Sequence, residues 1–368
     1  MTPMPSRPLL LRVLTESWLN VLLLAAPVSL VLRWRYGVSL WVFATAALSL
    51  VPAAGLIGTA TEHLARRSGP TLGGFLNATF GNAAELIIAI AALKAGHTEV
   101  VKASITGSII GNLLLVFGLS CYLGGIRHGH QKFNRIASGS ATVMLFLAIV
   151  ALVMPALVAL VSYGSLEAHP ETIDRLSFWS SIVLLGVYGG GLLFSFKSQR
   201  DVLRAHPGRD HGPRLPLSSA LGLLTFATVI TAVEAEVLIE ALEPALEGLG
   251  MSELFAGVIV VALVGNAAEH YSAVTAARDD QMTLALEISV GSSAQIALMV
   301  APVLVLLSYA LGSPMSLVFN AFEIAAIGLS VFAVALVSAD GESNWFEGLQ
   351  LLGVYVLIAL AFYVIPGP

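Results

Sequence analysis

Long apolar runs alternate with short polar clusters along the whole chain. A helix needs roughly 20 apolar residues to cross the hydrocarbon core of a bilayer. By that measure the pattern predicts eleven membrane-spanning helices and therefore an all-α polytopic membrane protein. The predicted spans cover residues 17–33, 39–65, 71–93, 99–122, 135–162, 174–196, 216–241, 253–276, 281–309, 315–338 and 344–366.

The composition agrees with this class. Hydrophobic residues make up 57% of the chain and charged residues only 11%, whereas about a quarter of the residues of a soluble domain are charged. The net charge of −5 is small and does not suggest a nucleic-acid partner. A single cysteine, Cys121, excludes an internal disulfide and a thiolate metal cage. The first apolar stretch lacks a clear small-residue cleavage site, so we expect it to stay as a span.

The spans fall into an ordered set of segments. We expect an N-terminal transmembrane helix in residues 1–35, a first five-helix repeat in 36–196, a basic cytoplasmic linker in 197–215 and a second five-helix repeat in 216–368. An odd number of helices in each repeat turns the second repeat upside down relative to the first. Such inverted repeats are typical of secondary transporters, whose substrate site lies near the bilayer midplane.

The basic residues predict the orientation of the chain. When the N-terminus is placed in the cytoplasm, most of the 18 Lys and Arg fall in cytoplasmic segments. Those on the outer side are Arg33, Arg35, Lys94, Lys102 and Arg175. The positive-inside rule therefore favours a cytoplasmic N-terminus and an external C-terminus. The Ala- and Leu-rich chain without organellar targeting indicates the inner membrane of a bacterium.

One pentapeptide, Gly-Asn-Ala-Ala-Glu, occurs at residues 81–85 and again at 265–269, half of the 368-residue chain further on. Each copy places a carboxylate inside a predicted span, where a charge is costly unless it is masked, paired or used. Glycine weakens a helix, and asparagine offers both a carbonyl and a donor. We therefore expect a helix break in each copy. The residues concerned are Gly81, Asn82 and Glu85 in the first copy and Gly265, Asn266 and Glu269 in the second.

Carboxylate and carbonyl oxygens are the ligands that Ca²⁺ requires. Glu85 and Glu269 from opposite repeats would neutralise its double charge. When the metal leaves, two buried carboxylates repel one another and lose hydration, so they should take up protons. A site that holds a divalent cation or protons in turn is an antiporter site. In the alternative, each Glu is masked by a hydrogen bond and only braces helix packing, but the doubled motif favours binding.

The next span of each repeat supplies further oxygens. Ser108 and Asn112 are four residues apart and share a helix face, and Ser292 and Gln295 are their counterparts. Small polar residues are also ordinary at helix contacts in membranes. Both cation binding and packing stay open for Asn112 and Gln295, and their recurrence at the same place favours binding.

Three other titratable residues flank the motif. Glu62 and Glu236 end the preceding spans and could gate the route to the site or carry protons, or they could be solvated helix ends. His270 directly follows Glu269, where the first copy has Leu86; it could tune proton affinity or hydrogen-bond in the core. A stripe of Glu236, Glu240, Glu243 and Glu247 is more typical of a solvated face than of a cation-attracting funnel.

Taken in order, these motifs resemble those of the Ca²⁺/H⁺ antiporters (CAX type) of the Ca²⁺/cation antiporter superfamily. The matching segments are both pentapeptides with His270, residues 107–116, 123–134 and 291–297. The resemblance implies an eleven-helix exchanger in which Glu85 and Glu269 carry Ca²⁺ or H⁺ in turn. Family members often have a proline before the second motif. This chain has Val260–Val264 there, so the break must come from Gly265 itself.

We therefore expect proton entry to drive Ca²⁺ out of the cytoplasm by alternating access. Ca²⁺ and H⁺ would be the transported ions, with no permanently bound cofactor, and no ATP, since a G-x-x-x-x-G-K-[ST] loop is lacking. The alternative is a Na⁺/Ca²⁺ or monovalent cation/H⁺ exchanger on the same scaffold. An intramembrane hydrolase would need a ligand set such as H-E-x-x-H, which the sequence lacks, and a passive channel has no need of inverted repeats.

Overall fold

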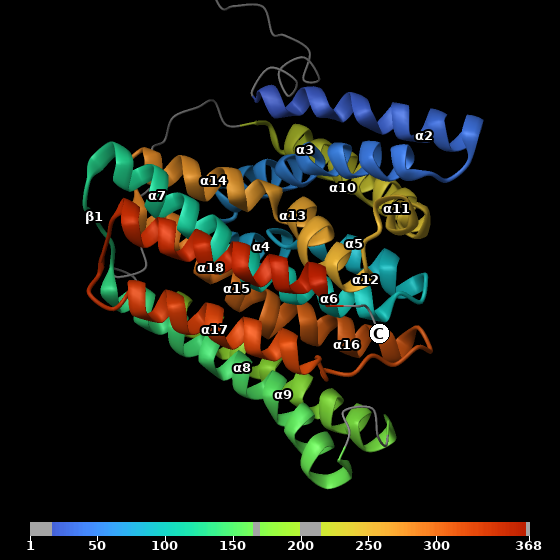
Figure 1. Cartoon of the computed structure of the whole chain (residues 1–368). Coiled ribbons are helices and arrows are strands. Elements are labelled where there is room, and N and C mark those ends of the chain that lie inside the picture. The colour runs from blue at the N-terminus through green and yellow to red at the C-terminus, as the bar shows by residue number, and fades with distance from the viewer. Residues whose placement is uncertain (1–16, 165–169, 199–214, 366–368) are drawn as a thin grey trace, which may run out of the picture. The chain divides into compact units, whose positions relative to one another are not determined.

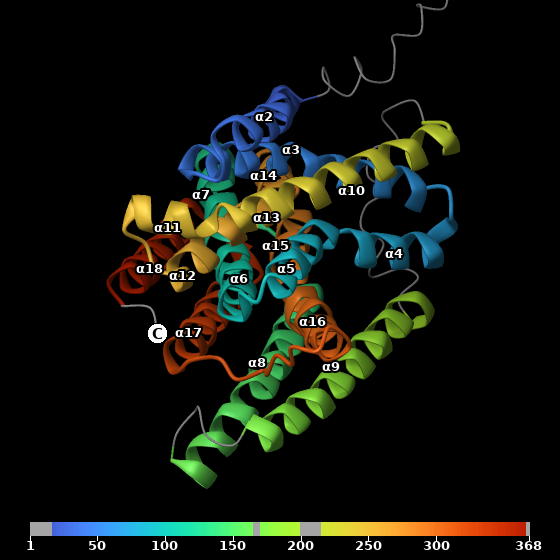
Figure 2. The same cartoon turned by 90° about the vertical axis from the view of Figure 1, so that its right-hand side faces the viewer.

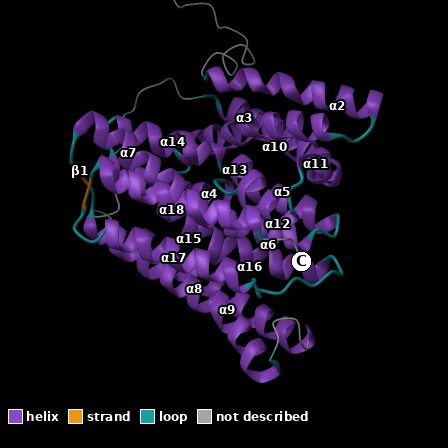
Figure 3. Ribbon diagram, viewed as in Figure 1, coloured by secondary structure: helices purple, strands orange, loops and turns teal. Residues whose placement is uncertain are grey.

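The computed structural model describes residues 17–164, 170–198 and 215–365, and these are almost entirely helical (Figure 3). Residues 1–16 and most of the predicted linker 197–215 lie outside the described residues. Figure 1 labels the main elements. In chain order they are η1 (Trp18–Leu24), α2 (Ala25–Tyr36), α3 (Leu40–Ala65), α4 (Gly69–Phe80), α5 (Ala83–Lys94), α6 (Thr98–Ile110), η2 (Gly111–Val116), α7 (Phe117–His128), β1 (Gln131–Lys132), α8 (Arg135–Tyr163), α9 (Pro170–Ser198), α10 (Leu217–Glu240), α11 (Leu242–Leu249), α12 (Glu253–Phe255), η3 (Ala256–Val261), α13 (Ala262–Gly265), α14 (Ala267–Arg278), α15 (Met282–Gln295), η4 (Ile296–Val300), α16 (Ala301–Ala310), α17 (Ala321–Val337), β2 (Glu342–Ser343) and α18 (Trp345–Val364).

Within this described part of the chain, eight helical runs are long and apolar enough to cross a membrane. They coincide with predicted spans, and the prediction of an all-α polytopic membrane protein is confirmed. The predicted spans that do not form one long helix are 71–93, 253–276 and 315–338. The first two are divided into shorter helices, and the third contains the 17-residue helix α17.

The predicted start of the span 315–338 is wrong, because α17 begins only at Ala321. Side chains satisfy the backbone of the preceding segment: the Met315 N–H donates to Ser308 Oγ at 2.8 Å, and the Leu317 N–H donates to Ser177 Oγ at 2.9 Å. Asn320 then caps the helix, accepting a hydrogen bond from the Glu323 N–H at 2.8 Å. A backbone satisfied in this way gains little from continuing the helix towards residue 315.

The structure divides into two compact units, each built from both halves of the chain. Unit 1 contains the described parts of Met1–Ala91 and Gly212–Leu249. In this unit α3 and α10 run along each other, and α2, α4 and α11 pack on α3 (Figure 2). Ala83 and Ile87 of α5 pack against an apolar cluster of α3 and α10, which fixes the first motif helix in this unit. The buried members of the cluster are Leu56, Ile57, Ala60, Leu223 and Ala227.

Unit 2 contains the described parts of Ala92–His211 and Gly250–Pro368. Here α18 packs along α7, α14 lies against α7 and α15, and α16 packs against α9 (Figure 1). A short antiparallel pair, β1 with β2, joins the segments that lead into α8 and α18. The second motif helix, α14, is therefore held between neighbours from both halves of the sequence.

In the described part of unit 2 a π-helix lies between two α-helices in the short run α12–η3–α13 and in two longer runs, α6–η2–α7 and α15–η4–α16. The two runs meet where the Ser293 hydroxyl donates to the Ile109 carbonyl at 3.3 Å. These residues are 184 positions apart, which is also the spacing of the two pentapeptides. Two positions that the predicted repeats would make equivalent therefore lie in hydrogen-bond contact.

Helices α6 and η3 approach closely because both carry glycine at the crossing. A Cβ built on Gly107 would overlap the backbone of Val258, and a Cβ built on Gly257 would overlap the side chain of Ala103. Small residues at such crossings are the usual means of tight helix packing in membranes. This close contact sets the position of Ser108, the residue that follows Gly107.

We expect Gly107→Ala to destabilise unit 2 by roughly 1–3 kcal/mol, the usual cost of inserting a methyl group into a packed interior. Gly111→Ala is the matched control on the same helical run, because a Cβ there meets no atom within 4 Å. Thermal unfolding of the detergent-solubilised protein measures the difference. Equal unfolding temperatures of the two variants would contradict the close approach.

Candidate functional site

Each copy of the pentapeptide interrupts a helix. In unit 1, α4 ends at Phe80 and α5 begins at Ala83, with Gly81 and Asn82 in the turn between them. In unit 2, α13 ends at Gly265 and α14 begins at Ala267. Asn266 links them with a non-helical φ of −98° and ψ of 13°.

The two motif carboxylates occupy the same local position. Glu85 lies in the first turn of α5, and Glu269 lies in the first turn of α14. The N-terminal end of a helix carries a partial positive charge that stabilises a carboxylate. The asparagines of both motif copies, Asn82 and Asn266, are buried. The carboxylate oxygens of Glu85 are buried as well.

A chain of side-chain hydrogen bonds surrounds the break in unit 2. The Asn266 amide donates to Ser108 Oγ at 2.7 Å and to the Ala262 carbonyl at 2.9 Å. Its own side-chain carbonyl accepts from the Asn112 amide at 2.8 Å. Ser108 and Asn112 therefore hold Asn266 from two successive turns of one helical run, α6 and η2.

Two buried oxygen atoms near this break lack a hydrogen-bond donor among the residues that the structure describes. They are Oε2 of Glu269 and Oδ1 of Asn112. A buried polar atom without a partner costs on the order of 1–3 kcal/mol. Oxygen atoms that lack donors are the type of ligand that a hard cation takes.

His270 lies beside this cluster. Its backbone N–H donates to the Asn266 carbonyl at 3.0 Å, and the residue lines a narrow hollow in unit 2. Ser108 and Tyr355 line the same hollow, together with small and aliphatic residues of α6, η2, η3 and α13. The hollow thus adjoins the hydroxyl that holds Asn266.

The counterparts in the second repeat lie in α15. This helix packs against α14, α6 and η2, so Ser292 and Gln295 belong to the same unit as the Asn266 cluster. Both side chains are half-buried. The neighbouring residue, Ser293, is the one whose hydroxyl donates to the Ile109 carbonyl of α6.

The two predicted gating residues are exposed. Glu62 forms an ion pair with Arg66 one turn along α3, and Glu236 lies on the exposed face of α10.

The buried carboxylate of α10 is Glu234, whose burial the sequence analysis did not foresee. It accepts hydrogen bonds from Ser29 of α2 at 2.9 and 2.7 Å and from Ser49 of α3 at 3.0 Å. These bonds join three helices of unit 1. One signal was available: Glu234 follows Ala227 and Thr231 at helical spacing, and all three are buried on one face.

No group of three or more His, Cys, Asp and Glu side chains forms a metal cage in the described ranges. Ca²⁺ sites in proteins commonly combine carboxylate, amide and backbone carbonyl oxygens.

The chain matches the family model described as "Sodium/calcium exchanger protein" over residues 38–197 and 219–364. A protein from Aphanothece halophytica named Ca(2+)/H(+) antiporter is 44% identical over 360 residues, covering 94% of this chain and 96% of the relative. A protein of the same name from Synechocystis sp. is 44% identical over 365 residues, covering 94% of this chain and 97% of the relative.

A solved structure, that of native YfkE, is also similar. It has a TM-score of 0.82 and 38% sequence identity, and the match covers 95% of this chain and 100% of the solved one. The similarity therefore extends through both units and both motif copies.

We expect Asn112→Ala to destabilise the protein by roughly 1–3 kcal/mol, because the buried Asn266 carbonyl would lose its described donor. Ser104→Ala is the control, since the Ser104 hydroxyl donates only to the Val101 carbonyl of its own helix. Thermal unfolding in detergent compares the two. If Asn112→Ala unfolds at the temperature of the control, the bond to Asn266 does not stabilise the fold.

Proposed function

The chain belongs to the sodium/calcium exchanger family, and on that premise we propose that it exchanges Ca²⁺ for H⁺ across a membrane as a secondary transporter. Relatives named Ca(2+)/H(+) antiporter, 44% identical over nearly the whole chain, support this choice of ions. The protein is then a transporter and not an enzyme. Ca²⁺ and H⁺ are its transported ions, and neither a permanently bound cofactor nor ATP is required.

The doubled helix break, with a carboxylate in the first turn after it, is the observation that carries this proposal. We assign Glu85 and Glu269 as the residues that bind Ca²⁺ or protons in turn. Two carboxylates balance the charge of one Ca²⁺, and protons replace it when it leaves, because bare carboxylates are costly away from water. The unpartnered Oε2 of Glu269 supports the assignment.

The polar neighbours complete the proposed site. Asn82 and Asn266 occupy the breaks that Gly81 and Gly265 introduce, and Ser108 and Asn112 hold Asn266 in place through the hydrogen bonds described above. Asn112 Oδ1 has no donor among the described residues, and we propose it as a ligand of the cation. We assign Ser292 and Gln295 the corresponding supporting roles in the second repeat. We propose that Glu62, Glu236 and His270 gate the route of ions to the site or transfer protons along it.

Alternating access between the two faces of the membrane completes the proposal. The chain is an integral multi-pass membrane protein, and bacterial relatives favour a bacterial plasma membrane. The charge pattern favours a cytoplasmic N-terminus and an external C-terminus. Proton entry would then drive Ca²⁺ out of the cell.

We expect Glu85→Gln and Glu269→Gln each to abolish Ca²⁺ uptake into proteoliposomes under an imposed pH gradient. An amide cannot carry the exchanged proton or balance the charge of Ca²⁺. Glu247→Gln, a change on the exposed face of α11, is the control. Circular dichroism and gel filtration confirm that the variants are folded. Wild-type uptake in either motif variant would remove that residue from the site.

The choice of counter-ion is tested in the same vesicles. We expect ⁴⁵Ca²⁺ uptake to follow the pH gradient, to reverse with it, and to be unaffected by replacing K⁺ with Na⁺. Uptake that requires a Na⁺ gradient and ignores pH would establish the alternative, a Na⁺/Ca²⁺ exchanger on the same scaffold.

A further inference from the structure

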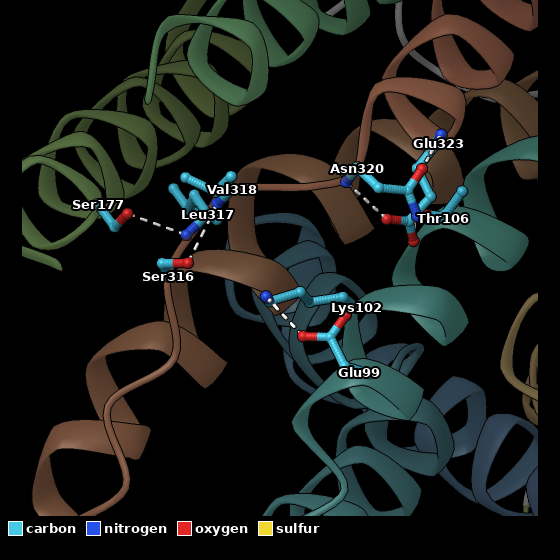
Figure 4. A network of polar contacts seen from close by, with 9 residues as sticks. All are labelled: Glu99, Lys102, Thr106, Ser177, Ser316, Leu317, Val318, Asn320 and Glu323. Carbon is cyan, nitrogen blue, oxygen red and sulfur yellow. Dashed lines mark hydrogen bonds and ion pairs between the residues drawn. The ribbon is translucent and has the colours of Figure 1, made fainter. Parts of the chain in front are cut away.

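Unit 2 contains a second buried carboxylate, Glu323, at the start of α17. The residue is 1% exposed. One carboxylate oxygen accepts from the Asn320 N–H at 3.0 Å, and the other accepts from the Thr106 hydroxyl of α6 at 3.0 Å. Figure 4 shows the carboxylate between these two partners. The described contacts give it no basic partner within ion-pair distance.

Capping of α17 does not by itself account for a charge at this position. A reciprocal capping box joins Asn320 and Glu323, and another joins Asn344 and Glu347 at the start of α18. Glutamine at the same helix position forms a capping box as well. Glu347 keeps its carboxylate half-buried at the chain surface, whereas Glu323 is buried and uses its second oxygen on another helix.

A line of polar side chains leads along α6 to Glu323. Glu99, Lys102 and Thr106 follow at helical spacing on one face of α6. Their exposure falls inward, from 49% for the Glu99 side chain to 13% for Lys102 and 0% for Thr106. Glu99 and Lys102 form an ion pair at 2.9 Å, shown in Figure 4. One face of α6 thus carries two pairs of polar contacts, Glu99 with Lys102 towards its exposed end and Thr106 with Glu323 in the interior.

This line is separate from the proposed cation site. Ser108 follows Thr106 by two residues, a rotation of about 200° around the helix. The hydroxyl that holds Asn266 and the hydroxyl that holds Glu323 therefore lie on nearly opposite sides of α6. Four elements, α6, α8, α18 and η2, pack most closely on α17. Their charged or titratable residues are Glu99 and Lys102 on α6, Arg135 and Tyr163 on α8, and Glu347, Tyr355 and Tyr363 on α18, with none in η2.

We propose that Glu323 is a proton-binding residue of the transporter, reached from solvent along Glu99, Lys102 and Thr106. The inference rests on the proposed H⁺ coupling. The carboxylate takes up one proton to become a carboxylic acid and later releases the same proton. Thr106 donates to the ionised form and, by rotation of its hydroxyl, accepts from the protonated form. Protons and Ca²⁺ then approach on different faces of α6.

Glu323→Gln tests the proposal, because glutamine keeps the capping box and the polar contact to Thr106 but cannot titrate. Glu347→Gln is the matched control. Proton-driven ⁴⁵Ca²⁺ uptake by the full-length protein in proteoliposomes is measured from pH 5.5 to 8.5. Ca²⁺/Ca²⁺ exchange, which moves no net protons, is measured in the same vesicles. We expect Glu323→Gln to lower proton-driven uptake roughly a hundredfold or more, the low end of what one positioned proton-transfer group contributes. It should leave Ca²⁺/Ca²⁺ exchange and the control variant unchanged.

Two results would overturn the proposal. If Glu323→Gln keeps wild-type uptake and pH dependence, Glu323 acts only as a helix cap. If proton-driven uptake and Ca²⁺/Ca²⁺ exchange are lost equally, the role of the residue is structural. Should Glu323→Gln fail to fold, Thr106→Val takes its place: it leaves the carboxylate and removes the hydroxyl, so an unshifted pH profile would also overturn the proposal. If the wild-type protein itself shows no proton-driven uptake, the proposed function fails instead.

Discussion

The absence of water from the bilayer core is the constraint on which this structure depends. Every buried polar group there needs a partner within the protein. Many buried hydroxyls donate to a carbonyl one turn back in their own helix, as Thr231, Ser289 and Ser330 do. Others join helices, as Ser29 and Ser49 do at Glu234. Against this background, the buried Oε2 of Glu269, which has no donor among the described residues, suits the cation ligand that we propose.

The hydropathy pattern alone predicted most of the helices. Long spans such as 39–65 and 135–162 follow from apolar length and turn signals, and the structure has helices at Leu40–Ala65 and Arg135–Tyr163. The breaks beside Asn82 and Asn266 were predicted from residue chemistry, because glycine and asparagine disfavour helix locally. Such features depend on residues near one another in the sequence, which a single chain reveals.

Features that depend on distant partners were not predicted. Glu234 shares a helix face with Ala227 and Thr231, but its burial depends on the packing of α2 and α3 on α10, which leaves Glu236 exposed. Glu323 owes its burial to α6, more than 200 positions earlier in the chain. The π-helices η2, η3 and η4 likewise lack a clear sequence signal, because one extra residue per turn is set by packing. The late start of α17 depends in part on the Ser177 hydroxyl, which is supplied by another helix.

The contact between Ile109 and Ser293 has a consequence for the direction of transport. In a perfectly repeated chain, exchanging the conformations of the two halves would interconvert two states of equal free energy. At this contact the symmetry is broken, because serine can donate a hydrogen bond to its counterpart's backbone and isoleucine cannot return it. The bond has no counterpart at the equivalent position of the other half, so exchanging the conformations of the two halves does not reproduce it. In a carrier built from the inverted repeats that the sequence predicts, such a mismatch would make one facing state more stable than the other, even when the ion concentrations on both sides are the same.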